Sequence, residues 1–160
     1  MTAKNPFTPQ DKDRFEIWDM LVQRDVTAYA KTDWASHRAD FLEGQFFGID
    51  GGHSANPDAW RSSFSDLEVY GKAWVASSLH MLENAEASEV LAGSFAATTL
   101  THIDITGHFA IAHKKFDGAI RFRSGAQEAL NWQTLYFCAK HEGRWWIIGF
   151  LGYLPNPMGA

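Results

Sequence analysis

The first half of the chain carries the hydrophobic spacing of helices. From Gln10 onward apolar residues recur every three or four positions, which predicts a helix with one apolar face. The residues of that face are Phe15, Trp18, Leu21, Val22, Val26 and Tyr29. Asp33 is expected to cap a second helix, because its side chain can accept hydrogen bonds from free amides of the first turn. The stretch 46–53 then reads as a short strand followed by a glycine-rich loop.

A third helix is predicted to begin at Asn56-Pro57-Asp58. This stretch combines a cap residue, a proline at the first helical position and an acid in the first turn. The helical pattern runs on through Phe64 to Leu79, with Gly71 as a candidate interruption.

After Ala85 the hydrophobic period changes to the alternation typical of strands. Strands are predicted over residues 96–105, 108–116, 131–140 and 145–153. Turns are predicted at Thr106-Gly107, Asp117-Gly118, Ser124-Gly125 and Glu142-Gly143. Helices first and an antiparallel meander second indicate an α+β domain.

The length of 160 residues suits one domain with a core of its own. We expect a flexible lead over residues 1–9, a single domain over 10–155 and a tail over 156–160. The sequence has no run of signal-peptide type and no segment long enough to span a bilayer, so no membrane partner is expected. The single cysteine, Cys138, excludes an intrachain disulfide and suits a reducing, cytoplasmic location.

Composition and charge narrow the range of partners. The aromatic content of 14% is high, and rings that are costly to leave in water are expected to line a cavity or an interface. The net charge of −5 and the lack of a dense basic run beyond residues 113–123 argue against nucleic acid as a partner. A metal or other cofactor is not expected, because His102, Asp104 and His113 would have to converge across two strands to supply three ligands.

The order of elements, the strand–turn–strand 103–110 and the ending Glu142-Gly-Arg-Trp-Trp-Ile147 resemble the nuclear transport factor 2-like superfamily. This superfamily includes ketosteroid isomerase, scytalone dehydratase, limonene epoxide hydrolase and the SnoaL-like polyketide cyclases. The resemblance covers most of the chain. It implies a cone-shaped fold in which N-terminal helices pack in the concave face of a curved, mostly antiparallel sheet around a small-molecule pocket. The fold hosts unrelated chemistries and inert members, so the resemblance alone assigns no activity.

A two-residue turn at Thr106-Gly107 would place Ile105 opposite His108 and Asp104 opposite Phe109. One face of this hairpin then carries Leu100, His102, Asp104, Phe109, Ile111 and His113. Its mixture of apolar and ionisable groups is the composition expected of a pocket wall. The other face carries Thr101, Ile103, Ile105, Ala110 and Ala112, which suit flat packing.

The final hairpin is apolar on both faces, so both faces need cover. One face is expected to carry Leu135, Phe137, Ala139, Trp146, Ile148 and Phe150. The other is expected to carry Tyr136, Cys138, Trp145, Ile147, Leu151 and Tyr153. Because helices cover one side of such a sheet, we expect the uncovered side to meet a second copy in a homodimer. The alternative is a plain surface of scattered aromatic residues.

His102 and Asp104 are the best candidates for catalysis. Spacing of two on a strand puts both side chains on one face, with Cα atoms roughly 6–7 Å apart. In a dry pocket such an aspartate can act as a base while the histidine moves a proton or holds a polar group. The alternative is that both side chains point into solvent beside a turn.

Six further residues are expected to line the pocket: Trp18, Tyr29, His53, Trp60, Trp74 and Tyr136. Core packing is the alternative for Trp18, and a solvated loop position is the alternative for His53. Tyr136 would offer a hydroxyl if its face turned inward.

Three functional hypotheses stay open from the sequence. The first is an enzyme that uses metal-free acid–base chemistry, of isomerase, dehydratase, cyclase or hydrolase type, on a small apolar substrate. The second is a non-catalytic module for ligand binding or dimerisation. The third is a small subunit of a larger oxygenase-type complex.

Overall fold

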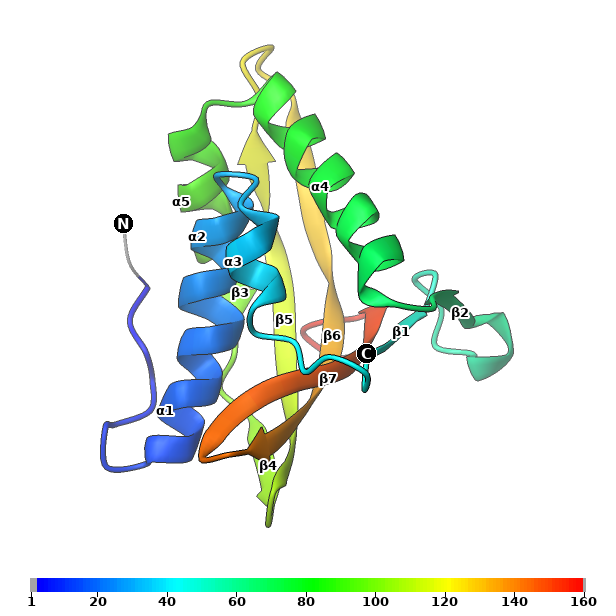
Figure 1. Ribbon diagram of the computed structural model, residues 1–160. Coiled ribbons are helices and arrows are strands. Elements are labelled where there is room, and N and C mark those ends of the chain that lie inside the picture. Colours follow the sequence, from blue (N-terminus) through cyan, green and yellow to red (C-terminus); the bar gives the residue numbers. More distant parts are fainter. Residues whose placement is uncertain (1–2, 160) are drawn as a thin grey trace.

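A curved sheet with helices gathered over its concave face forms the body of the protein (Figure 1). The structure is a computed structural model, and it describes residues 3–159. The strands are β1 (Phe47–Asp50), β2 (Arg61–Phe64), β3 (Thr98–Thr99), β4 (Ile103–Thr106), β5 (Phe109–Arg121), β6 (Gln127–His141) and β7 (Arg144–Leu154). Their order is β2-β1-β7-β6-β5-β3, and β4 also pairs with β5. Strand β1 runs parallel to β7, and the other strand pairs are antiparallel.

The N-terminal helical run confirms the pattern predicted from Gln10. It consists of α1 (Lys12–Trp18), a π-helical stretch (Asp19–Arg24) and α2 (Asp25–Tyr29), and its apolar face is buried. Helix α3 (Trp34–Arg38) follows, and Oδ1 of Asp33 accepts a hydrogen bond from the Ser36 amide at 3.1 Å, as the cap prediction requires. The α+β class and the packing of helices in the concave face are therefore as predicted.

The third helix starts later than predicted. Asn56-Pro57-Asp58 begins only a 3₁₀ turn (Pro57–Ala59), because the next residues pair with β1 as β2. Helix α4 (Leu67–Asn84) begins after Asp66, whose Oδ1 accepts from the Val69 amide at 2.9 Å. Gly71 does not interrupt α4. A Cβ there would lie 2.5 Å from the Trp34 indole, so the glycine permits close packing of α3 on α4.

Helix α5 (Ala87–Ala97) was not predicted, and it takes the place of the first residues of the predicted strand 96–105. The rest of that strand is divided between β3 and β4. The turn predicted at Asp117-Gly118 is also wrong, because β5 continues through both residues. A Cβ on Gly118 would lie 2.8 Å from Cβ of Ala97, so this glycine lets α5 approach the sheet.

The register of the first hairpin differs from the prediction. Thr106 pairs with Phe109 and Asp104 pairs with Ile111, so the turn residues are Gly107 and His108. Strand β4 ends one residue later and β5 begins one residue later than predicted, so the pairing shifts by two positions and the division of side chains between the two faces is unchanged. Leu100 is the exception, because it precedes β4 and is buried in the core.

The final hairpin contains a β-bulge that the alternation did not indicate. Its turn at Glu142-Gly143 is as predicted, with φ angles of 52° and 76°. Cys138 pairs with Ile147 and Phe137 pairs with Gly149, so Ile148 is the extra residue. After the bulge, each β7 side chain lies on the face of the sheet opposite to the one that simple alternation predicts. Phe150 therefore points inward beside Tyr136, while Leu151 lies outside opposite Leu135, which corrects the predicted positions of both.

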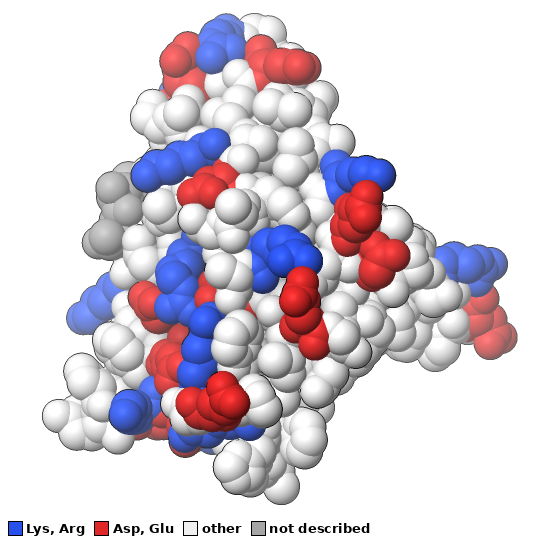
Figure 2. Space-filling view, in the orientation of Figure 1, with Lys and Arg blue, Asp and Glu red and all other residues white. Residues whose placement is uncertain are grey.

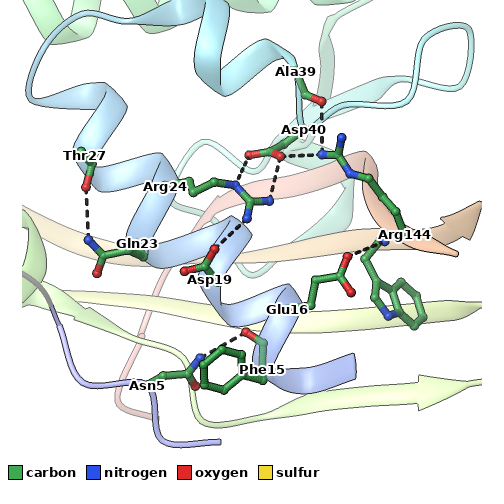
Figure 3. Close-up of polar contacts among 11 residues, drawn as sticks. Asn5, Phe15, Glu16, Asp19, Gln23, Arg24, Thr27, Ala39, Asp40 and Arg144 are labelled. Atoms are coloured by element: carbon green, nitrogen blue, oxygen red, sulfur yellow. Dashed lines mark hydrogen bonds and ion pairs between the residues drawn. The ribbon is translucent and has the colours of Figure 1, made fainter. Parts of the chain in front are cut away.

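A buried carboxylate joins three elements near the end of α3. Asp40 accepts two hydrogen bonds from Arg24, at 3.1 and 2.8 Å, and one from Nη2 of Arg144 at 2.7 Å (Figure 3). Arg24 also donates to Asp19 at 2.7 Å. The π-helical stretch, the segment after α3 and the start of β7 are thereby held together. On the face shown in Figure 2, charges of both signs are interspersed.

Both ends of the described chain lie against the domain. Asn5 donates from Nδ2 to the Phe15 carbonyl at 3.1 Å, and Phe7 packs against the core. Near the other end, Nε2 of Gln133 donates to the carbonyl of Pro155 at 2.8 Å. None of the helices in residues 3–159 is both long and apolar enough to cross a membrane.

Candidate functional site

A cavity of about 260 Å³ lies between the concave face of the sheet and helices α2 and α4. Nine of the residues that line it are aromatic, and they come from both the helices and the strands. Tyr70 and Trp74 project from α4, while Phe116, Trp132 and Tyr136 project from β5 and β6. The wall is therefore largely apolar with phenol hydroxyls set into it, which is the composition of a small-molecule site.

A buried ion pair contributes to the cavity wall. Asp25, the first residue of α2, lies 2.7 Å from Nζ of Lys114 on β5. The Lys114 side chain is only 1% exposed, and its ammonium also donates to the Leu21 carbonyl at 2.5 Å. The same ammonium lies 5.1 Å from the ring centre of Phe116. These contacts offset the cost of removing the ammonium from water.

Asp25 is held in its ionised form. Burial would raise the pKa of its carboxyl, but the charge of Lys114 and the hydrogen bond from its ammonium outweigh that effect, so the pKa lies below its ordinary value. At neutral pH the cavity wall therefore presents a carboxylate that can accept a hydrogen bond or a proton.

His37 lies beside Asp25 and is 1% exposed. Its Nδ1 is 3.5 Å from Oδ1 of Asp25, and its ring stacks on Trp74 with the ring centres 5.1 Å apart. Neither ring nitrogen has a hydrogen-bond partner among the described residues. Burial lowers the pKa of His37, so the ring is neutral at neutral pH.

The tyrosines around the cavity remain protonated. Burial raises the pKa of Tyr29 to about 12, and it raises the pKa values of Tyr70 and Tyr136 well above the ordinary value. The Tyr29 hydroxyl is 2.7 Å from the Ser77 hydroxyl. The phenols can therefore donate hydrogen bonds to a ligand throughout the neutral pH range.

The structure brings together three of the six residues predicted to line the pocket. Tyr29, Trp74 and Tyr136 all border the cavity. Trp18 is buried in the core instead. His53 is exposed in the loop after β1, and Trp60 is half-buried, with its indole donating to a backbone carbonyl.

His102 and Asp104 lie on the opposite side of the sheet. Both are exposed, and neither borders the enclosed cavity. The His102 ring stacks on His113, with ring centres 4.3 Å apart. The expectation that this face encloses the pocket is wrong, because the small side chains of Ala110 and Ala112 are the ones that face the core.

Asp104 borders a different feature, a hollow of about 280 Å³ on the outer face of the sheet. Phe47, Phe109 and Phe137 contribute to its rim together with Ile148. This hollow is apolar apart from Asp104 and Thr106.

Asp25, His37 and Lys114 were not predicted as site residues from the sequence. The positions of Asp25 and Lys114 nevertheless indicate burial. Asp25 is four residues after Leu21 and therefore lies on the apolar face of its helix. Lys114 is two residues after Ala112 and shares its inward face. An ionisable residue at an apolar position in both elements indicates a buried pair.

No protein-family model and no curated protein matches the sequence. Solved structures share its architecture. A nuclear transport factor 2-like superfamily protein from Salmonella enterica has a TM-score of 0.60 and 14% identity, over 94% of this chain and 96% of that one. A protein from Planctomyces limnophilus has a TM-score of 0.59 and 14% identity, over 92% and 99%.

An NTF2-like protein of unknown function from Shewanella baltica has a TM-score of 0.57 and 16% identity, over 91% of this chain and 96% of that one. Identities this low show a common fold and do not transfer an activity. Together with the curved sheet and the helices in its concave face, the likeness shows that this chain has the nuclear transport factor 2-like fold.

Proposed function

We propose that the cavity binds a small, largely apolar molecule and that Asp25 accepts a hydrogen bond or a proton from it. The observation that carries the proposal is the ionised Asp25 in the wall of an aromatic cavity, held there by a lysine that is itself buried. The cavity volume is below the roughly 300–1,000 Å³ of sites for drug-sized ligands, which favours a small ligand.

The same arrangement supports acid–base chemistry. Asp25 is the base, and the protonated phenols donate hydrogen bonds to an oxygen that becomes negative during the reaction. Proton transfer of this kind suits an isomerase, dehydratase, cyclase or hydrolase reaction. A non-catalytic binding module would use the same contacts without turnover.

Binding of 2-naphthol, followed by fluorescence quenching of Trp74 and Trp132, tests the role of Asp25. Replacement Asp25→Asn removes the charge with little change of shape. Since a hydrogen bond to a charged group is worth about 1.5–3 kcal/mol, the affinity for 2-naphthol should fall at least about tenfold. Naphthalene has no donor, and its affinity should change little.

Two further variants control this experiment. Ala73→Trp places a large side chain against the cavity from an exposed position on α4, on the same helix face as Ser77, and should weaken the binding of both compounds. Asp104→Asn lies on the outer face and should leave both affinities unchanged. The proposal fails if neither compound binds, or if Asp25→Asn binds 2-naphthol as tightly as the unaltered protein does. Weaker binding in Asp104→Asn would instead support the original candidate pair His102 and Asp104.

We also propose that the outer face of the sheet packs against a second copy of the chain. Phe109 is 63% exposed and Phe47 is 42% exposed, and both border the outer hollow. A protruding ring beside an apolar hollow is the self-complementary arrangement that a two-fold interface needs. A larger complex, in which this chain is a small subunit, is the alternative use of that face, and size-exclusion of the purified chain distinguishes the two.

A further inference from the structure

The charges in the cavity wall do not balance. The charged side chains that border the cavity are Asp25, Lys114 and Glu128. Asp25 and Lys114 form a neutral pair, and the tyrosines are kept uncharged by burial. One carboxylate and one ammonium cancel, so the wall keeps the single negative charge of Glu128.

Glu128 has no counter-ion within residues 3–159. It lies near the start of β6 opposite Ile120, is half-buried, and makes neither an ion pair nor a side-chain hydrogen bond with another described residue. Its charge contributes to the raised pKa of Tyr29, which is consistent with its place in the same wall. A positively charged ligand would supply the counter-ion that this carboxylate lacks.

Aromatic rings line the same wall, four residues along β6 from Glu128. Trp132 follows Glu128 on the inner face of β6, with its ring centre 4.6 Å from that of Phe116 and 5.5 Å from that of Tyr153. All three rings border the cavity. The faces of tryptophan and tyrosine rings attract cations, and the attraction is strongest where water is excluded.

We infer that the ligand of this cavity is an organic cation, such as a primary or quaternary amine, whose charge lies between Glu128 and the rings of Trp132 and Tyr153. This inference rests on the proposed function, because it names the class of molecule that the cavity binds. An anionic ligand would find no free ammonium in the wall, since Lys114 is already paired with Asp25. The net charge of −5 also favours the approach of cations.

Three phenols of nearly equal size test the inference: tyramine is a cation, tyrosol is neutral and 3-(4-hydroxyphenyl)propanoate is an anion. Their dissociation constants are measured by isothermal titration calorimetry at neutral pH and low salt. We expect tyramine to bind at least about tenfold more tightly than tyrosol, and the propanoate to bind more weakly than tyrosol. Added salt should narrow the difference between tyramine and tyrosol.

Replacement Glu128→Gln should remove the preference for tyramine and leave the affinity for tyrosol unchanged. Glu142→Gln is the matched control, because it removes the same charge from the exposed turn between β6 and β7 and should keep the preference. Equal affinity for tyramine and tyrosol, or a preference that survives in Glu128→Gln, overturns the inference while the proposed function stands. If none of the three phenols binds, the proposed function fails as well.

Discussion

Among the described residues, His37 is the buried polar residue whose side-chain nitrogens lack hydrogen bonds. Its neutral ring is enclosed by Trp34, Phe41 and Trp74, and neither nitrogen is hydrogen-bonded to a described residue. Burial holds its pKa below the ordinary value of 6.5, even though Asp25 and Asp40 favour the charged form. Below pH 6.5 this histidine is therefore protonated in the unfolded chain but stays neutral in the folded protein. Because the unfolded state binds more protons, the free energy of unfolding decreases as the pH falls.

Replacement His37→Phe should remove this dependence. Between pH 6.5 and pH 5 the free energy of unfolding of the unaltered protein should fall more steeply than that of the variant, by up to about 1.4 kcal/mol per pH unit. Urea denaturation at a series of pH values measures both slopes. His108→Gln alters an exposed histidine in the β4–β5 turn and should keep the steeper slope. Identical slopes for the unaltered protein and His37→Phe would show that the buried ring does not resist protonation.

Single residues also show why the candidate site could be predicted only in part. Tyr29, Trp74 and Tyr136 could be proposed from the sequence because they are large aromatic residues, and all three border the cavity. Asp25 and Lys114 each occupy an apolar position of their element, but neither position says which residue is the partner. Their pairing spans 89 positions of the sequence, and no local pattern encodes such a distance.

Among elements, the packing of α5 on β5 depends on a glycine that the sequence presents as a turn. Gly118 pairs with Leu130 in the middle of a continuous ladder, and the space that its missing side chain would fill is taken by Ala97. Asp-Gly is a strong turn signal, but it describes local backbone preference only. The contact with α5 could not be foreseen, because α5 itself was not predicted.

Replacement Gly118→Ala should destabilise the protein by about 1–3 kcal/mol, because its new Cβ would lie 2.8 Å from Cβ of Ala97 and 3.0 Å from its Cα. The free energy of unfolding in urea measures the loss. The second change Ala97→Gly removes one of the two clashing carbons, so the double variant should lose less than the sum of the two single variants. Additive losses would mean that the helix and the strand do not meet at this point.

Across the whole molecule, the β-bulge in β7 separates the two functions that we propose for the sheet. At the bulge Ile148 points outward into the hollow, and after it Phe150 points inward into the cavity. Simple alternation would have put both side chains on one face. The fold class, the order of elements and most of the faces follow from the sequence because they depend on periodicity, whereas a bulge depends on how two long strands pair.

The proposed interface on the outer face gives the last prediction. Two-fold symmetry uses each contact twice, so an exposed ring such as Phe109 would be buried twice in the dimer, at about 1.5–3 kcal/mol for each large apolar side chain. Phe109→Asp should therefore convert a dimer into a monomer in size-exclusion chromatography with light scattering. Leu79→Asp is the control, because Leu79 is an exposed apolar residue on α4 and should leave the dimer intact. The cavity is on the other side of the sheet, so Phe109→Asp should still bind 2-naphthol. A monomeric unaltered protein, or a Phe109→Asp variant of unchanged mass in solution, would contradict a dimer through this face.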